Sequence, residues 1–248
     1  MSAPLVRVEQ YDRIAVVVFA RPEKRNAMTP ELFEEWFAAL PGPDAIDGLV
    51  LAGDGPVFCG GFDLKMCLDK PGTLEVLLTQ LSRAVMELSM RDHPVVIAAK
   101  GAAIAGGCAL LGAADINVGD RAGQYGYPVV RLGLSPVISY PTLRTLMTDG
   151  HARERLLDTA LLSGEEAKRQ GLLHVLRDIH EDVGPVALRM CKMLAAKPRQ
   201  AFAATKQLMR ELAGSGVWAA RATAVSLETA DTAECTAGLT RALTLRNK

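Results

Sequence analysis

The chain has 248 residues, 49% of them apolar, which is enough to bury a large core as one domain or as a domain with an appendage. Its 28 Lys and Arg residues balance its 28 Asp and Glu residues. The composition therefore gives no reason to expect nucleic acid as a partner, and any anion-binding site must be local.

The first two thirds of the chain alternate short β-rich runs with amphipathic helical stretches. Predicted strands lie at 14–19, 49–53, 94–100, 116–118 and 174–176, and a long helix is predicted over 73–90. Thr29 followed by Pro30 marks the start of another helix, as a cap with proline at the first helical position. Alternation of this kind predicts an α/β fold.

From about residue 181 the pattern changes to almost continuous helix, rich in Ala and Leu. Predicted helices cover 183–195, 199–213, 217–230 and 232–245. Pro198 and the Gly-Ser-Gly turn at 214–216 separate them. We therefore divide the chain into a core, residues 1–195, and a C-terminal helical domain, residues 196–248.

The cysteines and histidines form no metal-binding pattern. The five cysteines lack Cys-x-x-Cys spacing and the four histidines are scattered, so we expect reduced thiols and no metal site. No apolar run is long enough for a signal peptide or a membrane span. We expect a cytoplasmic protein without membrane insertion.

Two glycine-rich turns stand out, FCGGFDLK at 58–65 and KGAAIAGGCAL at 100–110. Neither matches the glycine patterns of the common nucleotide-binding loops, which disfavours nucleotide binding in those modes. The second turn begins a helix, and unpaired N–H groups at a helix N-terminus suit a developing negative charge, such as that on a thioester oxygen. The alternative is that Gly106 and Gly107 only allow close helix packing.

Further motifs place these turns in a longer pattern. RPEKRNAM at 21–28 precedes the first turn, PVVIAAKG at 94–101 leads into the second, and VRLGLSP at 130–136 and LSGEEAKRQGLL at 162–173 follow. In this order they resemble the enoyl-CoA hydratase/isomerase (crotonase) family. The resemblance implies a crotonase-like spiral of ββα units with a C-terminal helical oligomerisation domain, and assembly as a homotrimer or a dimer of trimers. It also implies an acyl-coenzyme A thioester as the ligand, with coenzyme A belonging to the substrate and no permanently bound cofactor.

The resemblance also assigns site residues. By position, the backbone amides of Phe62 and Gly106 supply the oxyanion hole that polarises the thioester carbonyl. The positions at which the family contacts coenzyme A are Lys24, Arg25, Ala27 and Lys65, and basic side chains suit its phosphates. The alternative for the three basic residues is an ordinary solvated surface charge.

The sequence departs from the family where its acid and base should lie. The two glutamates of the family's hydratases are replaced by Ala109 and Val129, and a third slot, an acid in some isomerases, is Val137. A positioned acid or base contributes about 10²- to 10⁴-fold, so efficient standard hydration is not expected. The small apolar residues predict a dry site that favours an apolar acyl group.

Other proton-carrying side chains lie near the same motifs. They are Tyr125, Tyr127, Ser139 and Tyr140. Of these we favour Tyr140 as a catalytic residue, because it follows the LGLSP turn, which borders the acyl pocket in the family.

Three functions remain open. The first is an enzyme of hydratase or isomerase type, in fatty acid metabolism, with relocated acid and base groups. The second is a malonyl-type CoA decarboxylase, in which departing carbon dioxide leaves the enolate without a base. The third is a non-catalytic acyl-CoA-binding or carrier protein.

Overall fold

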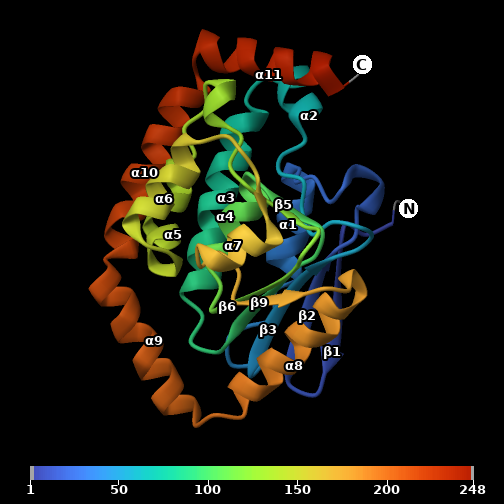
Figure 1. Cartoon of the computed structure of the whole chain (residues 1–248), viewed down its shortest axis with the longest axis vertical. Helices are drawn as coiled ribbons and strands as arrows, with labels where there is room; N and C mark the ends of the chain where they lie inside the picture. The colour runs from blue at the N-terminus through green and yellow to red at the C-terminus, as the bar shows by residue number, and fades with distance from the viewer. Residues whose placement is uncertain (1–2, 247–248) are drawn as a thin grey trace.

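The computed structural model describes residues 3–246, except for the side chains of residues 215, 216 and 246. A six-stranded sheet with strand order β1-β2-β3-β4-β6-β9 lies in the lower right part of the view in Figure 1. Its strands are β1 (Val6–Tyr11), β2 (Ile14–Phe19), β3 (Gly48–Gly53), β4 (Val95–Ala99), β6 (Ile116–Asp120) and β9 (Val175–Arg177). Strand β1 pairs antiparallel with β2, and every other pair is parallel.

A second sheet of three short strands lies beside the first. It consists of β5 (Ala102–Ile104), β7 (Gln124–Gly126) and β8 (Leu162–Ser163). Strand β4 leads into β5 and then into helix α4 (Gly106–Leu111), and the next unit places β6 against β4 and β7 against β5. This stacking confirms the predicted spiral of ββα units.

Strand β2 explains why segment 14–19 is an unbroken apolar run. Phe19 and Val17 belong to the main core, whereas Val16 and Val18 pack in a second cluster with helix α8 (Val183–Ala195) on the other face of the sheet. A parallel strand that is buried on both faces is apolar at every position rather than at alternate ones.

The remaining helices of the core surround these sheets. They are α1 (Pro30–Ala39), α2 (Leu64–Asp69), α3 (Thr73–Ser89), α5 (Tyr140–Leu146), α6 (Asp149–Leu157) and α7 (Gly164–Arg169), with 3-10 turns η1 (Pro22–Lys24), η2 (Val130–Leu132), η3 (Val137–Ser139) and η4 (His180–Asp182). The predicted cap of α1 is confirmed, because the Thr29 hydroxyl accepts a hydrogen bond from the N–H of Leu32.

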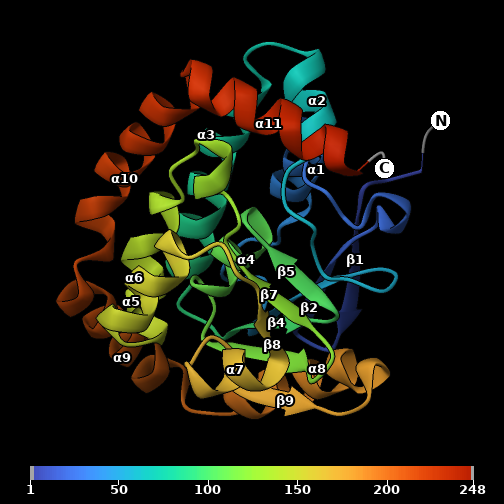
Figure 2. The same cartoon turned by 45° about the horizontal axis from the view of Figure 1, so that its top comes forward.

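The C-terminal helices wrap around the core. Figure 1 shows α9 (Arg199–Ala213) and α10 (Ser215–Ala230) along one side, and α11 (Ala233–Arg246) crossing one end beside α2, as Figure 2 also shows. Lys206 of α9 forms an ion pair with Asp115 at 2.8 Å, and Ser82 of α3 lies 2.6 Å from Thr223 of α10, hydroxyl to hydroxyl. The division at residue 195 stays a prediction, and all three helices contact the core.

All five cysteines are buried free thiols. Burial raises the pKa of Cys59, Cys67, Cys108 and Cys191 to about 12. Within residues 3–246, no group of His, Cys, Asp and Glu is arranged to hold a metal ion. No helix of this part of the chain is both long and apolar enough to cross a membrane.

Candidate active site

The two glycine-rich turns lie side by side. The N–H of Cys59 donates to the carbonyl of Ala102 at 3.1 Å, and the N–H of Ile104 donates to the carbonyl of Cys59 at 3.0 Å. Gly61 has a φ of 93°, and a Cβ there would lie 3.2 Å from the carbonyl oxygen of Ile104. Glycine is favoured at this position because L side chains rarely adopt this conformation and the neighbouring backbone is close.

Two backbone amides at this junction are unpaired. Among residues 3–246, neither the N–H of Phe62 nor that of Gly106 has a hydrogen-bond acceptor, although the adjacent Met28 N–H donates to the carbonyl of Gly61 at 2.8 Å. Gly106 is the first residue of α4, where an N–H has no partner within the helix. Both N–H groups are therefore available to a ligand, and an unpaired amide such as that of the buried Gly106 is uncommon in proteins.

The residue before Gly106 is strained. Ala105 has φ 51° and ψ −112°, although it is not glycine, and it forms the N-cap of α4. Such a conformation costs on the order of 1–3 kcal/mol and persists only where the surroundings impose it. Its own N–H is bonded to the carbonyl of Gly126 at 2.8 Å, so the turn is fixed on one side while the N–H of Gly106 remains free.

The paired glycines have different roles. A Cβ at Gly107 would lie 2.8 Å from the Cβ of Cys59 and 2.9 Å from its carbonyl oxygen, so this glycine is needed for packing. A Cβ at Gly106 would lie 3.1 Å from the Phe62 ring, which is a tight contact with a side chain. Close packing therefore accounts for Gly107, and it does not provide an acceptor for the N–H of Gly106.

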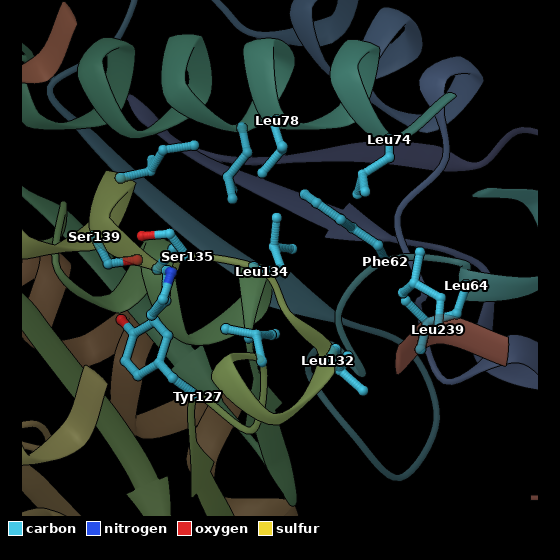
Figure 3. A pocket seen from close by; sticks show the side chains of 17 residues that line it. Phe62, Leu64, Leu74, Leu78, Tyr127, Leu132, Leu134, Ser135, Ser139 and Leu239 are labelled. Atoms are coloured by element: carbon cyan, nitrogen blue, oxygen red, sulfur yellow. The ribbon is translucent and has the colours of Figure 1, made fainter. Parts of the chain in front are cut away.

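An apolar cavity of about 50 Å³ opens at these amides. Phe62, Gly106, Ala109 and Val129 all line it, and leucines of α3 and Leu239 of α11 close it (Figure 3). Among the described residues, no Asp, Glu, Lys, Arg or His contributes to its wall. Both positions at which the resemblance places a glutamate are thus on the cavity, and both are apolar.

The polar groups of this cavity lie together. The side-chain oxygens of Tyr127, Ser135 and Ser139 lie on the same side of it in Figure 3. Tyr127 is buried, and its hydroxyl has no hydrogen-bond partner of acceptable geometry in the described chain. Burial raises the pKa of this phenol well above its ordinary value.

A second hollow of about 370 Å³ continues from the first toward the surface. Phe62, Ala105 and Val129 line both spaces, and the second also contains Arg131 and Arg241. Phe62 therefore lies where the apolar space meets a second one that carries positive charge.

Comparison with known proteins identifies the family. The family model described as enoyl-CoA hydratase/isomerase matches residues 9–241. The chain belongs to the enoyl-CoA hydratase/isomerase family. A Mycobacterium tuberculosis protein named "Probable enoyl-CoA hydratase" is 30% identical over 208 residues, which cover 82% of this chain and 80% of that protein.

Solved structures have the same crotonase fold. An enoyl-CoA hydratase/isomerase from Mycobacterium paratuberculosis is similar with a TM-score of 0.85 at 20% identity, over 96% of this chain and 98% of that one. An enoyl-CoA hydratase/isomerase from Xanthobacter autotrophicus Py2 also gives a TM-score of 0.85, at 23% identity, over 99% of this chain and 98% of that one.

The other positions that the crotonase resemblance assigns lie outside the two hollows. Lys24 and Arg25 are exposed around η1, Ala27 is half-buried, and Lys65 is exposed and pairs with Asp69 on α2. Val137 and Tyr140 are half-buried and line neither space. The Tyr140 ring instead faces the Arg144 guanidinium, whose central carbon is 5.9 Å from the ring centroid. Tyr127 and Ser139 are the proton-carrying candidates that reach the cavity.

The crotonase-like motif at 21–28 supports the turn that carries Phe62. The buried Asn26 side chain accepts the N–H of Arg21 at 2.9 Å and donates to the carbonyls of Asp54 and Val57 at 2.9 and 2.8 Å. The Arg21 guanidinium pairs with Asp63, next to Phe62, at 2.9 Å. Sequence reasoning assigned this motif to coenzyme A contacts and missed its role in holding the turn.

Proposed function

We propose that this protein binds an acyl-CoA thioester in the apolar cavity and acts on it as an enoyl-CoA hydratase/isomerase-like enzyme. The N–H groups of Phe62 and Gly106 hold the thioester oxygen and stabilise the enolate. The observation that carries this proposal is the pair of amides without an acceptor at the wall of one apolar cavity. In other enzymes, one oxyanion-hole donor contributes about 2.7–4 kcal/mol to the reaction.

The coenzyme A arm leaves through the second hollow in this proposal. Arg131 and Arg241 line that space, and guanidinium groups bind phosphate with strong, directed hydrogen bonds. Lys24 and Arg25 remain further candidates, because the Arg25 carbonyl accepts the N–H of Gly60 at 2.9 Å and so keeps this loop beside the first turn. Lys65 is less favoured because Asp69 already pairs with it.

The acid/base chemistry of this enzyme is non-standard. Ala109 and Val129 supply no carboxylate, and the proton-carrying groups on the wall are hydroxyls. A tyrosine whose pKa is raised is neutral and is a poor base at physiological pH. We therefore expect hydration to be slower than in an enzyme with two glutamates by about 10²-fold or more.

The composition of the same cavity wall also favours two alternative functions. A malonyl-type CoA decarboxylase needs the oxyanion hole but no base, since loss of carbon dioxide forms the enolate directly. A non-catalytic acyl-CoA carrier needs only affinity. The observation in favour of both is the absence of a carboxylate or imidazole base from the described wall of the cavity, although the lack of a cation there is unfavourable for the carboxylate of a malonyl-type thioester.

One experiment separates these functions. The purified protein is incubated with saturated, 2-enoyl, 3-enoyl and malonyl-type CoA thioesters, products are analysed by mass spectrometry, and binding of each thioester is measured by calorimetry. Hydrated or isomerised product supports the enzyme, and loss of carbon dioxide from the malonyl-type thioester supports the decarboxylase. Binding without any product supports the carrier, and absence of binding by every thioester refutes the proposed function.

We also infer that the chain assembles as a homotrimer or a dimer of trimers. Large apolar side chains are exposed on α9 and α10, among them Leu208, Leu212, Val217 and Trp218. Exposed apolar patches on folded proteins mark interaction surfaces. Light scattering should give three or six times the 26.5 kDa mass of one chain, and a monomer would contradict this inference.

A further inference from the structure

The apolar cavity has a polar end that the proposed function leaves unused. Tyr127 is only 1% exposed, yet its hydroxyl makes no hydrogen bond of normal geometry within residues 3–246, although the Ser139 hydroxyl and the Cys108 thiol are near enough to interact with it. Buried polar atoms are nearly always paired, so an unpaired one on the wall of a cavity requires an explanation. A ligand that accepts a hydrogen bond in the cavity would provide it.

The neighbours of this hydroxyl interact with it, but without the geometry of a normal hydrogen bond. Ser139 is 3% exposed and lies on the same side of the cavity in Figure 3, with Ser135 beyond it. The thiol of Cys108 is also nearby and influences the phenol, but thiols are weak hydrogen-bonding groups. The other side chains that Figure 3 labels are apolar, so the hydroxyls mark one definite place on the wall.

We propose that Tyr127, with Ser139 beside it, recognises a neutral oxygen atom on the acyl group, so that the cavity selects oxo-substituted acyl-CoA thioesters over plain hydrocarbon ones. This inference rests on the proposed binding of an acyl-CoA at the same site. It revises the expectation from Ala109, Val129 and Val137 that the site favours an entirely apolar acyl group.

The charge of the wall decides which oxygen fits. A carboxylate would enter a space that has no cationic side chain among the described residues, and burying an unpaired charge is strongly unfavourable. A keto oxygen accepts a hydrogen bond without this cost. The Tyr127 phenol is protonated at neutral pH, as any tyrosine is, and burial raises its pKa further. A protonated hydroxyl is the donor that such an oxygen requires.

Calorimetry with three ligands tests the inference. Pentanoyl-CoA is compared with 3-oxopentanoyl-CoA and 4-oxopentanoyl-CoA. Each oxo ligand differs from pentanoyl-CoA by one carbonyl group, and the two oxo ligands differ from each other in its position. The wild-type protein should bind at least one oxo ligand about 3- to 10-fold more tightly than pentanoyl-CoA. This factor corresponds to the net contribution of one hydrogen bond to binding. This comparison needs no variant.

The variant Tyr127→Phe removes only the hydroxyl. It should abolish the preference for the oxo ligand, measured as the ratio of the dissociation constants of pentanoyl-CoA and the oxo ligand for the same variant. The matched control is Tyr11→Phe, a half-exposed tyrosine on β1 that bonds to Glu9, and it should keep the full preference.

The possible results separate the two proposals. A wild-type preference that is lost in Tyr127→Phe and kept in Tyr11→Phe supports the inference. Equal binding of all three ligands, or a preference that survives in Tyr127→Phe, overturns the inference while the proposed acyl-CoA binding stands. If none of the three ligands binds, the proposed function fails, and the inference fails with it.

Discussion

The Tyr125 hydroxyl donates a hydrogen bond to the carbonyl of Ala99 at 2.8 Å and accepts one from the N–H of Asp120 at 3.2 Å. The Tyr127 hydroxyl, two residues further along the chain, has no such partner in the described structure. Both rings are buried. Two tyrosines with similar burial therefore differ: the Tyr125 hydroxyl links two strands, whereas Tyr127 lies on the wall of a cavity and its hydroxyl makes no hydrogen bond of normal geometry.

This difference predicts opposite effects of the same substitution. Tyr125→Phe leaves two buried backbone groups short of a partner and should lower the free energy of unfolding by about 1–3 kcal/mol. Tyr127→Phe removes an unpaired hydroxyl and should leave that free energy unchanged or raise it slightly. Urea unfolding of both variants at neutral pH measures the effect. Equal losses in the two variants would contradict this assignment.

Asn26 should be essential to the turn that carries Phe62. Asn26→Ala removes three hydrogen bonds to backbone groups, two of them carbonyls near the first glycine turn. We expect the free energy of unfolding to fall by about 2–3 kcal/mol, together with weaker binding of acyl-CoA. Gln10→Ala is the control, because that amide bonds to the backbone at an exposed site. A similar loss in both variants would argue against a special role for Asn26.

His93 predicts a pH dependence of stability. Burial lowers its pKa from 6.5 to about 4, so the unfolded chain binds a proton at a higher pH than the folded chain does. The stability from keeping this ring neutral is complete above pH 6.5 and is lost as the pH falls toward 4, by about 2–3 kcal/mol. Denaturant unfolding between pH 7 and pH 4.5 should give a steeper fall for the wild type than for His93→Asn. Parallel curves would exclude this contribution.

Restoring a carboxylate tests whether the missing glutamates limit the rate of hydration. Val129 lines the cavity, whereas Val137 does not. Val129→Glu should therefore raise hydration of 2-butenoyl-CoA, by at least about tenfold, since a positioned acid or base contributes about 10²-fold or more. Val137→Glu adds the same group off the wall and should not raise the rate. Mass-spectrometric initial rates decide between them, and equal rates in the two variants would show that position 129 is not the catalytic slot.

The main sheet and the two turns could be predicted from the sequence. Segment 14–19 is apolar throughout, which predicts a buried strand. The glycine turn at 100–110 and the VRLGLSP motif at 130–136 fix the positions of Ala109 and Val129 in the family pattern. Both residues line the cavity. Strands β5, β7 and β8 have only two or three residues each. A pattern with a period of two residues cannot be recognised over so short a run.

The side-chain environment of the site could not be predicted. Tyr140 and Tyr127 both lie near family motifs, and only the path of the backbone decides which one faces the cavity. Arg241 reaches the second hollow from α11, far along the chain. Whether the Phe62 N–H has an acceptor depends on which carbonyl groups of the neighbouring loop already accept other N–H groups. The tertiary structure decides this, and the local sequence does not.

The infrared spectrum of a bound thioester tests the oxyanion hole directly. Pentanoyl-CoA labelled with ¹³C at its thioester carbonyl is measured free in buffer and bound to the protein. Two N–H donors on that oxygen should weaken the C=O bond, so its stretching frequency should fall on binding. If the thioester binds and the frequency does not fall, the amides of Phe62 and Gly106 do not form an oxyanion hole.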